Sequence, residues 1–168
     1  MMHICTYESP IGQLLLAESE NQICGAWFSG ARYFGAGLAP DAIEMTDHPI
    51  LKLAHDWLDR YFSGLQPTLG DLPILISGSP FRKRVLRALM AIPYGETTTY
   101  GALARSLATE IGGNFSAQAV GGAVGHNPIS VIIPCHRVIG ADGSLTGYAG
   151  GLEKKRWLLD HETMVKPS

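Results

Sequence analysis

The residue types best suited to chemistry lie in one segment, Val-Ile-Ile-Pro-Cys-His-Arg-Val at positions 131–138. Three β-branched residues open it, which predicts a short buried strand, and Pro134 ends that strand because proline lacks the N–H of an interior strand. Cys135 and His136 follow without a gap. A thiolate is the reactive form of cysteine, and a neighbouring imidazole lowers the thiol pKa from about 8.5. The segment therefore predicts a nucleophilic cysteine.

Direct contact between Cys135 and His136 is disfavoured by their adjacency, because neighbouring side chains of an extended chain point to opposite faces. Either the backbone turns sharply at Cys135 or a water connects the sulfur to the imidazole. The histidine also needs a group to orient it. The nearest carboxylates in the sequence are Asp142, Glu153, Asp160 and Glu162. The alternative is an inert buried cysteine beside a surface histidine, since free cysteines usually belong to the core.

Length and composition limit the class of protein. A chain of 168 residues forms one domain or two small ones, and 46% hydrophobic residues with a mean hydropathy of +0.10 allow a real core. No apolar run approaches the roughly 18 residues of a membrane-spanning helix. The start of the chain has neither the basic nor the apolar region of a secretion signal. We therefore expect no membrane partner and a cytoplasmic location.

The cysteines support the same compartment. Cys5, Cys24 and Cys135 are an odd number and imply no disulfide framework, which fits a reducing environment. Cys5 and Cys24 fall on expected strands, with His3 close by. A zinc site needs four converging ligands, and without any CxxC spacing core or edge thiols are favoured. We predict neither a metal nor a cofactor.

Charge is distributed unevenly along the chain. A net charge of −2 and a pI near 6.3 argue against a general nucleic-acid binder. However, residues 1–80 hold three Lys/Arg against nine Asp/Glu, whereas residues 81–168 hold ten against six. This asymmetry predicts either a polyanion that contacts the second half only or an ordinary solvated basic face.

The amino-terminal half, residues 1–78, is expected to be a small α/β domain. Alternation of apolar residues predicts strands that form an antiparallel sheet at His3–Tyr7, Gln13–Glu18 and Ile23–Phe28. Pro49 opens a helix that runs to about Phe62, with its apolar residues at helical spacing. Residues 29–47 are irregular and remain unassigned.

The carboxy-terminal half, residues 79–168, is expected to be mostly helical. Ser79 and Pro80 begin a helix that ends before Pro93. Further helices are predicted at Gly101–Ala108, capped by Thr99, and at Ala117–Gly125, capped by Ser116. The last of these has almost no bulky side chains, and each glycine inside a helix costs up to about 1 kcal/mol relative to alanine. A helix that lets another backbone approach closely would explain this composition.

Two helices joined by a loop, the second with small side chains, are typical of a helix-turn-helix. From the pattern alone, a DNA-binding reading and a plain helical core are equally supported. Beyond the cysteine segment, Gly140–Gly143 predicts a turn and Ser144–Tyr148 an extended stretch. A final helix is expected at Leu152–His161, with Leu152, Trp157, Leu158 and His161 on one side and Glu162 at its end.

Residues 79–162 resemble the O6-alkylguanine-DNA alkyltransferases. The resemblance is carried chiefly by Pro-Cys-His-Arg-Val at 134–138, which is highly specific to that family. Gly-Gly-Ala-Val at 121–124, Asn-Pro at 127–128, Gly-Tyr-Ala-Gly-Gly-Leu at 147–152 and Trp-Leu-Leu at 157–159 add to it. Residues 1–78 match only through Ser-Pro-Ile-Gly at 9–12. The family's fold implies an α+β protein, with a sheet domain followed by a winged-helix-like helix-turn-helix domain.

The resemblance implies a single-turnover repair protein that removes alkyl groups from O6-alkylguanine, and possibly O4-alkylthymine, in DNA. Cys135 would be the acceptor, His136 the base that acts through a water, and Glu162 the residue that orients it. The DNA- and lesion-binding residues that it implies are Tyr100, Gln118, Asn127, Arg137, Val138, Tyr148 and Ala149. The implied partner is double-stranded DNA, bound by a monomer from the minor groove with the base flipped out. In a prokaryote the protein would lie on the nucleoid.

Two departures from the family concern base flipping. The family has an arginine three residues before the Gly-Gly pair, and this chain has Gln118 there. The stretch from Tyr100 to Gln118 is also longer than usual. Alternatives to the transferase are a non-enzymatic lesion sensor or DNA-binding regulator, which would lack the nucleophile, and a cysteine hydrolase, which would need an oxyanion hole and turnover.

Overall fold

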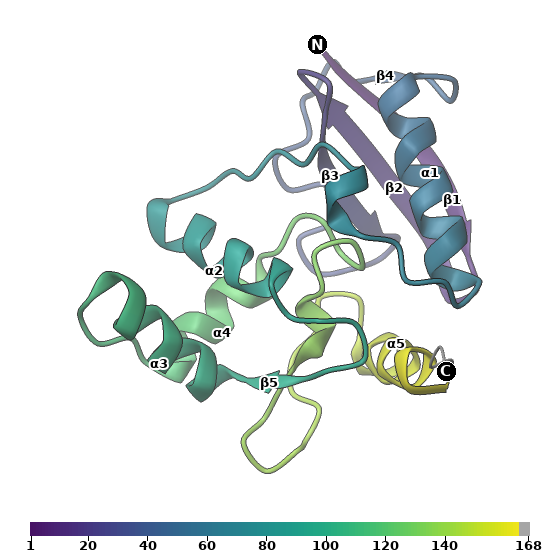
Figure 1. The fold of residues 1–168 in the computed structure, drawn as a ribbon. Coiled ribbons are helices and arrows are strands. Elements are labelled where there is room, and N and C mark those ends of the chain that lie inside the picture. Colours follow the sequence, from purple (N-terminus) through teal and green to yellow (C-terminus); the bar gives the residue numbers. More distant parts are fainter. Residues whose placement is uncertain (165–168) are drawn as a thin grey trace.

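The computed structural model describes residues 1–164, which form a sheet with one helix, followed by a helical part (Figure 1). The sheet has four strands in the order β3-β2-β1-β4, with β1 and β4 parallel and the other neighbours antiparallel. Their bounds are β1 Met2–Ser9, β2 Gly12–Ser19, β3 Gln22–Phe28 and β4 Ile43–Glu44. The three predicted strands are confirmed, and β4 lies in the region that the sequence left unassigned.

Helix α1 (Pro49–Phe62) lies against this sheet (Figure 1) and begins as predicted, with Pro49 in its first turn. The side chain of His48 caps the helix by accepting from the Ile50 N–H. One face of α1 is buried, namely Leu51, Ala54, Trp57, Leu58 and Tyr61. This face packs in the same core as Leu14 and Leu16 of β2. The sheet thus fixes the position of α1, and with it the position of Tyr61.

The helical part contains α2 (Pro80–Met90), α3 (Tyr100–Ile111), α4 (Ala117–Gly125) and α5 (Leu152–Met164). The predicted caps are confirmed, because Ser79, Thr99 and Ser116 each accept from the backbone N–H three residues ahead. Helix α3 runs three residues further than expected, so residues 112–116 alone join it to α4. A two-stranded parallel sheet links β5 (Thr98–Thr99) to β6 (Val138–Ile139).

The predicted strand at residues 131–133 is wrong. Val131 has a positive φ of 70°, which is unusual for a β-branched residue, and the Ile132 N–H bonds the Ser130 carbonyl across it. A second tight turn follows at Pro134 (φ −81°, ψ 63°), closed from the Cys135 N–H to the Ile133 carbonyl. Burial by tertiary contacts, and not sheet pairing, explains the apolar run. The sharp backbone turn before Cys135 was one of the two predicted options.

Two other expectations at the carboxy-terminal end are corrected. The stretch expected to be extended at residues 144–148 is interrupted at Gly147, which has a positive φ of 66°, whereas the turn at 140–143 is confirmed by the Gly143 N–H bond to the Gly140 carbonyl. Helix α5 extends past Glu162, and its fully buried residues are Lys155, Leu158 and Glu162, whereas Leu152 is 48% exposed. The predicted face is therefore right for Leu158 and wrong for Leu152, and it missed Lys155 and Glu162, which are buried for their polar contacts.

The edge of the amino-terminal sheet supports the cysteine segment. Strand β3 bonds the chain after α4, from the Ala26 N–H to the Pro128 carbonyl and from the Ser130 N–H to the Ala26 carbonyl. The residues between the two parts, 65–79, contain a short 3-10 turn, Leu69–Asp71, and a single parallel bridge from Ile74 to Ile23 of β3. Among residues 1–164, no helix is both long and apolar enough to cross a membrane.

Candidate active site

Cys135 begins a short 3-10 turn (Cys135–Arg137) and is 7% exposed, on the wall of a cavity of about 570 Å³. The cavity is lined by the end of α4 and by the glycine-rich loop before α5, residues 147–151. Arg32 and Tyr33 of the amino-terminal part also line it. Its volume falls in the range that holds a small organic molecule. The nearly buried thiol of Cys135 thus borders a cavity that is large enough for a nucleobase.

The surroundings of Cys135 act on its thiol in opposite directions. Burial raises the pKa of the Cys135 thiol above its ordinary value, because the thiolate loses solvation. A side-chain hydrogen bond from Asn127 and the positive charge of Lys155 lower that pKa in part. The thiol is therefore protonated at rest and needs a base when it reacts.

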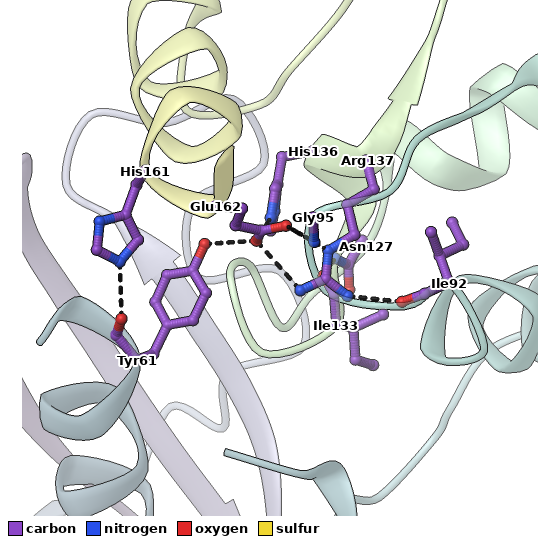
Figure 2. Close-up of polar contacts among 9 residues, drawn as sticks. All are labelled: Tyr61, Ile92, Gly95, Asn127, Ile133, His136, Arg137, His161 and Glu162. Atoms are coloured by element: carbon purple, nitrogen blue, oxygen red, sulfur yellow. Dashed lines mark hydrogen bonds and ion pairs between the residues drawn. The ribbon is translucent and has the colours of Figure 1, made fainter. Parts of the chain in front are cut away.

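Glu162 is the centre of a buried polar network that includes His136, the neighbour of Cys135 (Figure 2). Its Oε2 accepts from His136 Nε2 and from the Tyr61 hydroxyl, both at 2.6 Å, and from Arg137 Nη2 at 3.1 Å. Its Oε1 accepts from Arg137 Nε at 2.8 Å and from the Gly95 N–H at 3.1 Å. A carboxylate has about four lone-pair sites, so these donors saturate it and fix its orientation.

This network sets the charge state of its members. Burial acts to raise the pKa of Glu162, but the hydrogen bonds and charges of His136 and Arg137 outweigh it and hold that pKa well below its usual range. Burial lowers the pKa of His136 despite the opposing carboxylate. His136 is therefore neutral at pH 7. Since its Nε2 donates to Glu162, its Nδ1 carries the lone pair, and Nδ1 is buried without a partner among the described residues.

Asn127 connects the end of α4 to the cysteine segment. Its amide nitrogen donates to the Ile133 carbonyl at 2.9 Å, and its amide oxygen accepts from the Ile129 N–H at 3.0 Å. The side chain is 6% exposed, and it lowers the pKa of the Cys135 thiol in part. Its bonds to the backbone hold the two tight turns that present the sulfur to the cavity.

Sequence reasoning missed Lys155, which is fully buried on α5. Its Nζ donates to the carbonyls of Val138, Thr146 and Gly147, the latter two at 3.0 and 3.1 Å. Tyr100 donates to the same Thr146 carbonyl at 2.7 Å. Together they hold the glycine-rich loop over the cavity. The spacing of Lys155, Leu158 and Glu162 on one helical face was the signal available in the sequence.

The structure separates the predicted site residues into three groups. Those that line the cavity are Tyr100, Asn127, Cys135, Tyr148 and Ala149. Those buried behind it are His136, Arg137, Val138 and Glu162. Arg137 forms an ion pair with Glu162, and its Nη1 donates to the Ile92 carbonyl at 2.6 Å. A lesion-binding residue would be expected to face the cavity, but Arg137 is not among the residues that line it. Gln118 is exposed on α4 and lies outside the cavity lining.

A second cluster, in the amino-terminal part, has the residue types of a metal site. The ligand atoms of His3, Glu18 and His48 lie within 4.8 Å of one another. The two imidazole rings are stacked, however, with centroids 4.8 Å apart, and a shared ion would have to lie in the planes of both. His48 Nδ1 accepts from the Ile50 N–H, so the proton is on Nε2, which faces Glu18 at 3.4 Å. These contacts fit a hydrogen-bonded cluster that joins the sheet to the start of α1 better than a metal centre.

A sheet domain that supports a helical domain, with a nearly buried cysteine at the wall of a base-sized cavity, fits a DNA-binding transferase. Comparison with known families agrees. Residues 2–76 match the "6-O-methylguanine DNA methyltransferase, ribonuclease-like domain", and residues 80–164 match the DNA binding domain of the same description.

Curated relatives and solved structures give the same result. The methylated-DNA–protein-cysteine methyltransferase of Mycobacterium tuberculosis is 43% identical, covering all of this chain and 96% of the relative. That of Haemophilus influenzae is 39% identical over 93% of this chain and 83% of the relative. The crystal structure of the M. tuberculosis O6-methylguanine methyltransferase superposes with a TM-score of 0.83 at 41% identity, over 100% and 96% of the two chains. The M. tuberculosis protein in complex with DNA gives 0.82 at 40%, over 99% and 96%.

The chain therefore belongs to the O6-methylguanine-DNA methyltransferase family. The predictions of that family, of the α+β fold and of a DNA-repair methyltransferase that binds DNA are confirmed.

Proposed function

We propose that this protein repairs O6-alkylguanine in DNA by moving the alkyl group to Cys135 Sγ. The sulfur attacks the alkyl carbon, an S–C bond forms, and the bond from that carbon to guanine O6 breaks. The electron pair leaves with guanine, which finally takes up the proton that the thiol lost. The observation that carries the proposal is the placement of Cys135 on the cavity wall with the His136–Glu162 pair buried behind it. A thioether does not revert, so each molecule acts once.

His136 is proposed as the base. Its neutral imidazole presents Nδ1 as the free lone pair. A water is proposed to relay the thiol proton to Nδ1, because this nitrogen has no direct hydrogen bond to Cys135 among the described residues. Glu162 holds the tautomer through Nε2 and stabilises the imidazolium that forms. Arg137 is proposed to hold Glu162 in place. Its buried ion pair favours this role over contact with DNA.

On the DNA side, helices α3 and α4 are proposed to dock duplex DNA that carries the lesion. A base inside the duplex does not reach a thiol behind the cavity mouth, so the nucleotide must flip out of the stack. The small residues of α4 allow the DNA backbone to approach this helix closely. The exposed Gln118 is proposed to fill the gap that the flipped base leaves in the stack. Tyr148 and Ala149 line the cavity and are proposed to contact guanine O6. Tyr100 also lines it and is proposed to contact the phosphate of the flipped nucleotide.

Two further expectations are part of the proposal. The division between domains falls at residues 78 and 79, which is supported by the irregular segment before the Ser79 cap and by the separate family matches on either side. The protein acts as a monomer in the cytoplasm, at the nucleoid in a prokaryote, since one chain supplies every side chain of the site.

The decisive experiment is intact-mass analysis after incubation with duplex DNA that contains O6-methylguanine. We expect a gain of one methyl group per molecule, with no further turnover, and a methylated peptide that contains Cys135. Cys135→Ser abolishes the gain, whereas Cys5→Ser and Cys24→Ser retain it. Lesion binding without any gain in mass would instead identify a sensor, and multiple turnover without a retained group would identify a hydrolase.

A further inference from the structure

Tyr61 belongs to the amino-terminal domain, yet its hydroxyl lies inside the network of the other domain (Figure 2). It comes from the last turn of α1, is 1% exposed, and donates to Glu162 Oε2 at 2.6 Å. This is the same oxygen that accepts from His136 Nε2 at 2.6 Å. A residue 101 positions away in sequence therefore shares the oxygen that orients the base.

The position of Tyr61 is fixed independently of the site. Its ring stacks on Trp57 within α1, with centroids 5.7 Å apart and an interplanar angle of 4°. Its backbone carbonyl bonds His161 Nε2 at 2.8 Å, which ties α1 to the residue next to Glu162 on α5 (Figure 2). The hydroxyl is thus delivered by a rigid helix. Burial, followed by the negative charge of Glu162, raises the pKa of Tyr61, so the hydroxyl remains a donor at all working pH values.

We propose that Tyr61 is a positioning residue for alkyl transfer, through which the amino-terminal domain sets the orientation and hydrogen-bond strength of Glu162 toward His136. This inference rests on the proposed function. Removal of a group that hydrogen-bonds to a metal ligand typically costs 10- to 100-fold in activity. We expect an effect of about this size for the Tyr61 hydroxyl, which orients Glu162 in the same indirect way. Tyr61 does not touch the substrate, since it is absent from the lining of the cavity that holds Cys135.

The expected direction follows from the shared oxygen. Without the Tyr61 hydroxyl, Oε2 keeps more negative charge for the His136 Nε2–H, so the pKa of His136 rises. Other charged or titratable groups facing this pair remain, namely Arg137 on Glu162, Lys155 near His136, and the Tyr94 and Tyr148 hydroxyls near Glu162. A base must be neutral to accept the thiol proton. A higher pKa of His136 therefore moves the acid limb of the rate profile to higher pH.

The test compares Tyr61→Phe with Tyr7→Phe. Tyr7 is a matched control, because it is 4% exposed in the same domain and donates to a carboxylate of α1, Asp59, at 2.8 Å. Single-turnover methyl transfer is measured from pH 5 to 9, together with duplex affinity and the rate on free O6-benzylguanine. We expect Tyr61→Phe to slow transfer about 10-fold at neutral pH on both substrates, with unchanged duplex affinity and a shifted acid limb. Tyr7→Phe should keep the wild-type profile.

Two outcomes would overturn the inference. One is a Tyr61→Phe profile that coincides with that of Tyr7→Phe, and the other is a loss confined to duplex affinity. In the Glu162→Gln background, removal of the Tyr61 hydroxyl should have no further effect on the acid limb, and additive effects would also count against coupling. Wild-type protein in the same assay separates this inference from the proposed function. If wild type gains no methyl group at Cys135, the function fails, and if it does while Tyr61→Phe is normal, only the inference fails.

Discussion

Each half of this protein holds a cysteine, a histidine and a buried glutamate, but the cysteine on the wall of the proposed active-site cavity belongs to the carboxy-terminal set. In the amino-terminal set, His3 and His48 both contact Glu18, and Cys5 lies on the same strand as His3. In the other set, His136 contacts Glu162 and follows Cys135 directly. The residue types are the same, so the difference lies in how each set is placed.

Two features separate the sets. Both nitrogens of His48 are engaged, whereas His136 has a buried lone pair on Nδ1. Burial raises the pKa of both Cys5 and Cys135, but Cys135 borders a cavity of about 570 Å³ and Cys5 is not among the residues that line it. A histidine–glutamate pair thus becomes a base only where a lone pair, a nucleophile and room for a substrate meet.

The largest expected effect is on the transfer rate. His136→Gln or Glu162→Gln should slow methyl transfer about 10²- to 10⁴-fold, the usual contribution of a general base. The double variant should be little worse than either single one, because the two residues act as a unit. The controls His3→Gln and Glu18→Gln should transfer at the wild-type rate. A comparable loss in these controls would break the distinction between the two sets.

The next effect is on stability and its pH dependence. Glu162→Gln leaves Arg137 buried without its partner and should cost about 3–5 kcal/mol in the free energy of unfolding at pH 7. Since the folded pKa of Glu162 lies below its ordinary value of 4.5, its stabilisation is present above that pH and is lost as the pH falls below it. Urea unfolding at pH 7 and near pH 4 measures this. A difference that stays constant with pH would contradict the depressed pKa.

A smaller effect is expected after the reaction. Methylation adds a carbon to a side chain that is only 7% exposed, and close-packed surroundings resist added volume. We expect the methylated protein to lose about 1 kcal/mol of stability, at the low end of the typical cost of overpacking. Thermal unfolding before and after the reaction reports this as a lower melting temperature. Cys135→Ser protein, treated in the same way, should show no change, and an equal or higher melting temperature for methylated wild type would refute the prediction.

The smallest effect concerns Gln118, which is exposed on α4 outside the cavity. An amide fills the place of a flipped base but carries no charge to hold phosphates or to stack as a planar cation. Flipping costs a few kcal/mol from a duplex and less from a single strand. Gln118→Arg should therefore speed repair of duplex DNA a few-fold, by more than it affects single strands or free O6-benzylguanine. It should also steepen the salt dependence of binding by about one phosphate contact. Equal changes on all three substrates would show that another residue opens the duplex.

Much of the fold was predictable because its signals are local. Strand alternation, the caps at Ser79, Thr99 and Ser116, and the small-residue helix α4 depend on residues close in sequence, and all are confirmed. The family was evident from the Pro-Cys-His-Arg-Val segment. The strand expected at residues 131–133 failed for the opposite reason. Its turned backbone depends on Asn127 and on the edge of β3, which the local pattern does not contain.

The sequence by itself determined the proposed nucleophile, its histidine neighbour and most of the elements around them, since adjacency and periodicity act over a few residues. Only the tertiary structure decided which groups complete the site. Tyr61 and Glu162 are 101 residues apart, and the buried Lys155 of α5 reaches back to the Val138 carbonyl. Buried charges go where their hydrogen bonds are satisfied, and those partners are set by how α1, α5 and the glycine-rich loop pack together.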